Sequence, residues 1–224
     1  DTVGGHLESL SLLMRQNDAL NHPRIAYTLL EDFKAKHGDL GGATLIAPSG
    51  QMLVSTAQKP GARLPNVMEN PDWNADFAKN LNATGLSINR PQRGYLLEAW
   101  LMPLRYTARD SLQRVEFLIQ TSILMERQQA LWANLGLQPG AQIGLMREDG
   151  VLLSMWPMPG GKFDPKSFQA KTLSQAIQKN SANGFFESID ASWIDHRVGT
   201  YQRLRTAPLY AFMSVSNELN LRLW

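Results

Sequence analysis

The sequence predicts an α+β fold in which a long N-terminal helix precedes two similar units, each with an antiparallel sheet of about five strands and flanking helices. Three observations support this fold class. Apolar residues recur at helical spacing over residues 6–37. A glycine between two short apolar runs occurs at Gly50 and again at Gly150, 100 positions later. A helical pattern and three strand-like segments follow each of these turns, which indicates an architectural repeat.

The N-terminal segment consists mainly of helix formers. The triplet "NHP" at 21–23 interrupts it, and Pro23 suits the first turn of a new helical stretch because its missing N–H would have no partner there. Glycines at 41 and 42 end the pattern. We therefore expect one long, kinked helix. Its apolar stripe consists of Leu7, Leu10, Leu13, Met14, Ile25, Leu29 and Phe33.

The first unit begins with a β-hairpin over residues 43–56. Residues 58–71 contain three prolines and a glycine, which predicts a loop. A helix follows, in which Trp73, Phe77 and Leu81 share one face at i, i+4 and i+8. Three strand-like segments complete the unit, at 85–89, 95–106 and 114–123.

The second unit repeats this order. A short helix is expected over 124–136 and a hairpin over 141–157. A helix is expected over 164–180, three strands over 184–216, and the start of another helix from 217. The inward residues of the helix over 164–180 are Phe168, Leu173 and Ile177.

Composition excludes several classes of function. Apolar residues make up 43% and charged residues 19%, as in an ordinary soluble globular protein. The net charge is +2 with no long basic run, which argues against a nucleic-acid partner. The absence of cysteine excludes disulfides and a thiol nucleophile. No apolar run reaches about 18 residues.

Motifs for catalysis or metal binding are not found in the sequence. The four histidines are not spaced as H-x-x-x-H or HExxH, and no nucleophile elbow or phosphate-binding loop occurs. We therefore expect no catalytic residues, no metal and no cofactor. The chain starts at Asp1 within helical sequence and ends on "LNLRLW", which leads us to expect a piece of a longer protein.

Four stretches in this order resemble the double Cache domain, the tandem PAS-like periplasmic sensor of bacterial receptors. They are "WNADFAKNLNATGLSINRPQRG" (73–94), "WLMPLRYTARDSLQRVEFLIQTSI" (100–123), "LGLQPGAQIGLMREDGVLLSMWP" (135–157) and "YQRLRTAPLYAFMSVS" (201–216). The combination is most similar to the version found in membrane-bound diguanylate cyclases and phosphodiesterases.

The resemblance implies the following division of the chain. Residues 1–40 form an N-terminal signalling helix, 41–125 the membrane-distal Cache unit, 126–214 the membrane-proximal unit and 215–224 the start of an exit helix. The domain would lie in the periplasm, anchored in the inner membrane by flanking helices outside this chain, and would form a homodimer through the N-terminal helix.

By the same resemblance, the domain is not an enzyme: it senses a small-molecule ligand and controls cyclic di-GMP turnover by a cytoplasmic output domain. Two alternatives remain open. The chain could be the sensor of a chemoreceptor or a histidine kinase, or it could be an interaction and dimerisation module with no small-molecule ligand.

The ligand is expected in the distal unit, between the sheet and its covering helix and loop. Strand alternation places Trp100 and Tyr106 on one face and Arg105 on the other. Trp100 and Tyr106 could stack on a ligand, although Trp100 could equally be part of the core. Tyr95 completes the aromatic candidates.

The polar candidates are Arg90, Arg105 and Gln120. An arginine can clamp a carboxylate through its bidentate fork, although each could instead be a solvated side chain. Gln120 lies in the apolar run "FLIQTSI" and requires a partner, either a ligand or an internal hydrogen bond.

The amino-acid-binding subset of the family resembles W-x-x-P-Y-x-D in the central strand. Here Trp100 and Pro103 match, while Leu104 and Tyr106 replace the tyrosine and the aspartate. The aspartate that would hold an α-ammonium is missing from this motif. We therefore do not expect an amino-acid ligand of that type.

Overall fold

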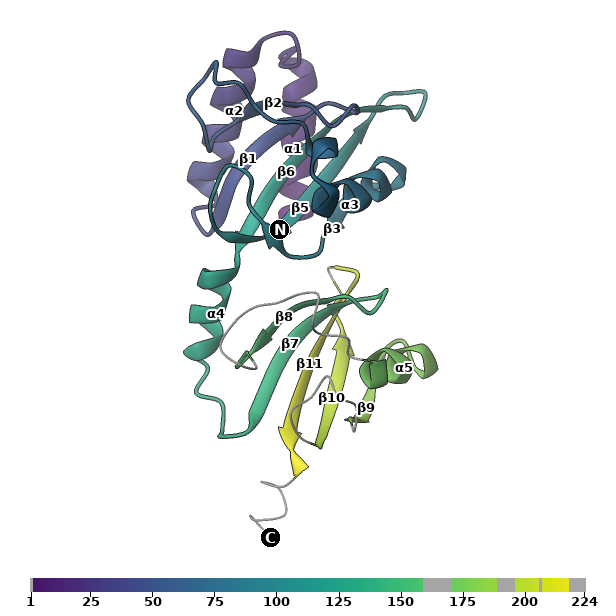
Figure 1. The fold of residues 1–224 in the computed structure, drawn as a ribbon. Helices are drawn as coiled ribbons and strands as arrows, with labels where there is room; N and C mark the ends of the chain where they lie inside the picture. Colours follow the sequence, from purple (N-terminus) through teal and green to yellow (C-terminus); the bar gives the residue numbers. More distant parts are fainter. Residues whose placement is uncertain (1, 159–170, 189–195, 206, 218–224) are drawn as a thin grey trace. The chain divides into compact units, whose positions relative to one another are not determined.

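The structure is a computed structural model that describes residues 2–158, 171–188, 196–205 and 207–217. Its residue contacts divide the chain into two compact units, Asp1–Met125 and Glu126–Trp224 (Figure 1). Each unit contains one antiparallel sheet with helices beside it. The α+β class with two antiparallel sheets is therefore confirmed.

The first unit has a six-stranded sheet in the order β2-β1-β6-β5-β3, with β4 also paired to β5. Its helices lie on both faces of this sheet (Figure 1). Its elements are α1 (Val3–Gln16), α2 (Pro23–Lys36), β1 (Leu40–Ile46), β2 (Met52–Ser55), η1 (Val67–Glu69), α3 (Pro71–Asn82), β3 (Gly85–Ile88), β4 (Gln92–Arg93), β5 (Trp100–Arg109) and β6 (Val115–Leu124).

The second unit has a five-stranded sheet in the order β8-β7-β11-β10-β9, which is the strand order of the first sheet without β4. Its elements are α4 (Met125–Ala133), β7 (Ala141–Arg147), β8 (Leu152–Trp156), α5 (Lys171–Lys179), β9 (Asn183–Ser188), β10 (Arg197–Arg203) and β11 (Leu209–Ser216).

The N-terminal segment forms two separate helices instead of one long kinked helix. Asp18 has a φ of 50°, in the left-handed region, and Pro23 then begins α2 at its first turn. The turn allows both helices to pack on the same face of the sheet, α1 against β3 and β5 and α2 against β1 and β2 (Figure 1). Leu13 and Ile25, which the helical stripe predicted to be inward, are consequently exposed.

Helix α3 covers the opposite face of the first sheet. Trp73 and Phe77 are buried there against Ile46, Met52 and Leu118. In the second unit, the prediction for α5 is confirmed at its inward residues, since Leu173 and Ile177 are buried. Phe168, residues 189–195 and most of the expected exit helix lie outside the described residues. No described helix is long and apolar enough to span a membrane.

The first hairpin of each sheet pairs its two strands in the same register. Gly50 and Gly150 form the hairpin turns with φ values of 85° and 83°, which favour glycine. Ile46 and Met146 lie four residues before these glycines, and both pair with the residue two positions after the glycine. Because the strand order also agrees, positions of β2, β1, β6, β5 and β3 can be matched to positions of β8, β7, β11, β10 and β9, while β4 has no counterpart.

Candidate functional site

A row of polar side chains crosses the first sheet. The cross-strand register joins Ser55, Thr44, Gln120, Arg105 and Ser87 in this order. The row lies under α3, because the Arg105 guanidinium carbon is 5.6 Å from the centre of the Phe77 ring. The Thr44 and Ser55 hydroxyl oxygens are 2.9 Å apart, which satisfies one end of the row internally.

Arg105 is the central residue of this row and is 0% exposed. Its Nε donates to Oε1 of Gln120 at 2.7 Å, but neither of its terminal nitrogens has a hydrogen-bond partner among the described residues. Burial lowers the pKa of Arg105 to about 10, and the nearby Asp76 carboxylate opposes this shift. The side chain is therefore a cation at neutral pH, with buried donors that lack an acceptor.

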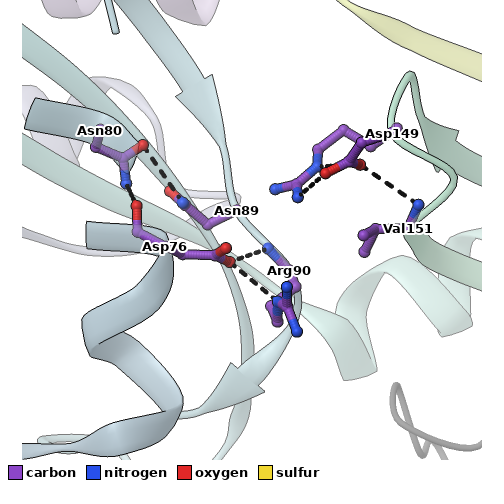
Figure 2. A network of polar contacts seen from close by, with 7 residues as sticks. Asp76, Asn80, Asn89, Arg90, Asp149 and Val151 are labelled. Atoms are coloured by element: carbon purple, nitrogen blue, oxygen red, sulfur yellow. Dashed lines mark hydrogen bonds and ion pairs between the residues drawn. The ribbon is translucent and has the colours of Figure 1, made fainter. Parts of the chain in front are cut away.

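Asp76 of α3 faces the same region and is only 1% exposed. Its Oδ2 accepts from the backbone N–H of Arg90 at 3.1 Å and from Nε of Arg90 at 3.3 Å (Figure 2). The Arg90 side chain is 45% exposed, so this ion pair lies at the boundary with solvent. Oδ1 of Asp76 has no partner among the described residues.

The side-chain amides of Asn89 and Gln92 add two further acceptors. Nδ2 of Asn89 donates at 3.4 Å to Oδ1 of Asn80, which lies one turn after Asp76 on α3 (Figure 2). Oδ1 of Asn89 and Oε1 of Gln92 are buried without a partner in the described part of the chain. The backbone N–H of Asn89 donates to the carbonyl of Pro103, and Gln92 is paired with Leu101. Both amide residues thus lie opposite β5 positions that share the face of Arg105.

The site therefore combines unpaired donors with unpaired acceptors. The donors are the terminal nitrogens of Arg105, and the acceptors are oxygens of Asp76, Asn89 and Gln92. Buried polar groups without partners are costly, at about 1–3 kcal/mol for each group. A molecule with an anionic group and a multi-donor group would satisfy both sets.

The structure brings together three of the six residues proposed from the sequence. Arg105 and Gln120 are paired, and Arg90 lies at the edge of the same site through Asp76. Gln120 therefore has an internal hydrogen bond, and its direct contact with a ligand remains a prediction.

The three aromatic candidates lie elsewhere. Tyr106 lies on the α1 face, hydrogen-bonded to Ser11, and burial raises its pKa, with a further increase from Glu8. Trp100 lies on that same face by strand alternation. Tyr95 is 53% exposed and packs edge-on against Trp73, with ring centres 5.8 Å apart.

The residues that supply the unpaired acceptor oxygens of this site, Asp76, Asn89 and Gln92, were not predicted from the sequence. Asp76 and Asn80 lie on the same stripe of α3 as the buried Trp73 and Phe77. Polar residues on an inward helical stripe are a recognisable signal, because buried polar groups need partners. Asn89 and Gln92 carry no comparable signal, since Asn89 directly follows β3 and Gln92 begins the two-residue strand β4, which is too short to show an alternation.

The second unit fills the counterpart of the polar row with its own side chains. The corresponding positions are Met155, Gly144, Phe212, Tyr201 and Gly184. The Phe212 ring occupies the space that a Cβ would need at Gly144, and the Tyr201 ring does the same at Gly184. The Tyr201 hydroxyl lies 2.7 and 2.8 Å from the carbonyl oxygens of Ala176 and Asn180. The described parts of the two units thus differ in kind at the same place in the fold.

No group of three or more histidine, aspartate or glutamate side chains that could hold a metal ion occurs within the described ranges.

Comparison with known proteins gives structural neighbours only. No family model matches the chain, and no curated protein matches it in sequence. The extracellular domain of a protein assigned as a histidine kinase, rpHK1S-Z16, is 17% identical with a TM-score of 0.74, over 99% of this chain and 88% of that chain.

Two chemoreceptors are also similar in structure. The ligand-binding domain of the Pseudomonas aeruginosa PAO1 amino acid chemoreceptor PctB, in complex with L-Arg, is 15% identical with a TM-score of 0.64, over 96% of this chain and 86% of that chain. The ligand-binding domain of Campylobacter jejuni Tlp3, in complex with 4-methylisoleucine, is 14% identical with a TM-score of 0.57, over 95% and 81%. These likenesses show the fold that the chain shares with sensor domains.

Proposed function

We propose that this chain is the extracytoplasmic sensor domain of a transmembrane signalling protein, and that a small molecule binds in its first unit between α3 and the sheet. One observation carries the proposal: Arg105 is fully buried with both terminal nitrogens unpaired among the described residues, in a site that also holds unpaired acceptors. The second unit fills the equivalent row with aromatic side chains, which supports a division between a sensing unit and a relaying unit.

The ligand chemistry follows from the unpaired atoms. A carboxylate suits the Arg105 fork, and an ammonium suits the three oxygens, because it presents three N–H donors. An α-amino acid or a similar small zwitterion has both groups. The central strand has Tyr106 where the amino-acid-binding motif has aspartate, but Asp76 of α3 supplies a buried carboxylate from another element. Asp76 can therefore hold an α-ammonium in place of the aspartate that the central strand lacks, and an amino-acid ligand fits the site.

The location and the output belong to the same proposal. The neighbours are extracellular or ligand-binding domains of histidine kinases and chemoreceptors, which favours an output of that kind over the cyclic di-GMP turnover expected from the sequence. A periplasmic location in an inner-membrane protein is consistent with these neighbours. In any such receptor, the ligand must bind one signalling state better than the other.

The experiment is a thermal-shift screen of the purified chain against L-amino acids, amines and monocarboxylates, with hits verified by calorimetry. A ligand at about 100 times its Kd stabilises the bound unit by about 2.7 kcal/mol, which raises the Tm by several degrees. We expect zwitterions to give this shift, Arg105→Gln to abolish it, and the control Arg93→Gln on the exposed side of β4 to keep it.

The rival function is an interaction or dimerisation module without a small-molecule ligand. It would be favoured if no compound class shifted the Tm. A shift that persists in Arg105→Gln would instead place the ligand outside this site and contradict the proposed location.

A further inference from the structure

An apolar row crosses the second sheet on the face opposite α5. Cross-strand register joins Phe185, Thr200, Met213, Ile143 and Trp156 in this order. Phe185 is 88% exposed and Met213 is 45% exposed. The neighbouring residues Phe186 and Phe212 point the other way and are buried in the core with α5. The sheet is therefore packed on one face and open on the other, within the described residues.

The same row is buried in the first unit. Its counterparts are Ile88, Leu104, Thr121 and Ala43, with exposures of 8%, 4%, 1% and 0%. Helix α1 packs over β3 and β5 at one end of this row, and α2 packs over β1 at the other (Figure 1). The difference in exposure between the two rows therefore follows from the helices and not from the strands.

One of these two helices has a counterpart in the second unit. Helix α4 leads into β7 as α2 leads into β1, and Nε2 of Gln129 donates to the carbonyl of Met155 on β8. Trp132 of α4 contributes to the open face, where it lines a pocket together with Ile143 and Met213. The part of the chain that the structure describes contains no counterpart of α1, and this is the position where Phe185 and Thr200 are exposed.

The open face is hollowed and almost uncharged. Two shallow, open pockets of about 570 and 620 Å³ lie on it, and both are lined by Phe185, Thr200 and Met213. Glu187 is the single charged side chain among their described lining residues. A hollowed apolar surface of this kind is typical of a docking site.

We propose that this face docks an amphipathic α-helix in the place that α1 occupies over the first sheet. The internal repeat defines the chemistry of this partner. Helix α1 presents Leu7, Leu10 and Met14 to its sheet, and Gly4 comes close to Leu86 of β3, where a Cβ would lie 3.4 Å from Cδ2. The docked helix accordingly has apolar residues at i, i+3 and i+7, with a small residue near its first turn and no charge on that stripe.

The absence of cysteine allows a direct test with one introduced thiol. Phe185→Cys places a reporter in the open row, and Leu112→Cys, at a site 70% exposed in the first unit, is the control. The probe is a synthetic peptide of residues 2–17, which contains α1. The matched control peptide carries Leu7→Ser, Leu10→Ser and Met14→Ser. The rate of maleimide labelling is measured with each peptide, after circular dichroism has verified that both variants are folded.

We expect saturating α1 peptide to slow labelling of Phe185→Cys by about fivefold or more, as mass action requires for an occupied site. The serine peptide should not slow it, and Leu112→Cys should label equally in all samples. Equal rates with both peptides would overturn the proposal. Protection that grows with protein concentration in the absence of peptide would also overturn it, because a second copy would then be the occupant.

Discussion

Arg105 and Gln120 face each other across β5 and β6, and Nε of Arg105 donates to Oε1 of Gln120 at 2.7 Å. This bond uses one edge of a fully buried guanidinium and leaves both terminal nitrogens without a partner among the described residues. A half-satisfied buried cation weakens the unliganded fold and strengthens its response to an anion. The pair therefore links the stability of the first unit to its proposed function.

Removal of this charge should stabilise the empty domain. We expect Arg105→Met to raise the free energy of unfolding by about 1–3 kcal/mol, because a well-packed apolar side chain replaces an incompletely paired buried charge. Urea unfolding of the purified chain checks this, with Arg93→Met as the exposed control. A loss of stability in Arg105→Met would show that the bond to Gln120 outweighs the cost of burial.

Removal of the Asp76 side chain should cost more stability than removal of the Arg90 side chain, although the two form one ion pair. Arg90→Ala should cost less than about 1 kcal/mol, because its side chain is 45% exposed. Asp76→Ala should cost about 1–3 kcal/mol, since it also leaves the backbone N–H of Arg90 unpaired. A double-mutant cycle measures the coupling, and equal costs for the two single variants would contradict this account.

One methyl group added beside Phe212 should destabilise the second unit, because the Phe212 ring packs directly over Gly144. Gly144→Ala places a Cβ where the Phe212 ring lies, so we expect a loss of about 1–3 kcal/mol from overpacking. Gly38→Ala is the matched control, because a Cβ added there would meet nothing within 4 Å beyond its chain neighbours. Thermal unfolding of both variants compares them, and a neutral Gly144→Ala would mean that Phe212 can move aside.

Asp110 should make stability depend on pH at the turn between β5 and β6. Its pKa lies below the ordinary 3.8, first because the backbone N–H of Arg114 donates to it, and also through the side chain of Arg114 and the backbone N–H of Leu112. A lowered folded-state pKa means that the stabilisation is fully present well above pH 3.8, decreases as the pH approaches 3.8, and is lost as the pH falls through the folded value.

The test of this prediction is Asp110→Asn, with stability measured by urea unfolding from about pH 7 down to about pH 2. We expect the variant to be less stable than the parent at neutral pH. The difference should remain constant down to about pH 5 and then shrink, as the carboxylate of the parent becomes protonated. A difference that did not change with pH would mean that the turn does not depend on the charge.

The elements that local signals define could be predicted from the sequence. The hairpins at Gly50 and Gly150 and the inward face of α3 follow from turn chemistry and periodicity. The separation of α1 from α2 could not be predicted, because a kink and a reversal carry the same sequence signal at Pro23 and only packing on the sheet distinguishes them.

The candidate site could likewise be predicted from the sequence only in part. Gln120 required a partner on sequence grounds, and the register of β5 and β6 supplies Arg105. That Asp76 belongs to the site depends on how α3 lies over the sheet, which periodicity within one helix does not determine. The difference between the polar row and its aromatic counterpart is likewise visible only once the registers of both sheets are known.

Arg105 and Tyr106 are consecutive residues of β5, and the strand sends them to opposite sides of the sheet. One faces Phe77 of α3, and the other is hydrogen-bonded to Ser11 of α1. The two faces of the first sheet are therefore only one peptide bond apart. A ligand that pulls on Arg105 by a fraction of an ångström would not need a chain of intermediate side chains to reach α1, because the strand itself is the shortest mechanical connection between them.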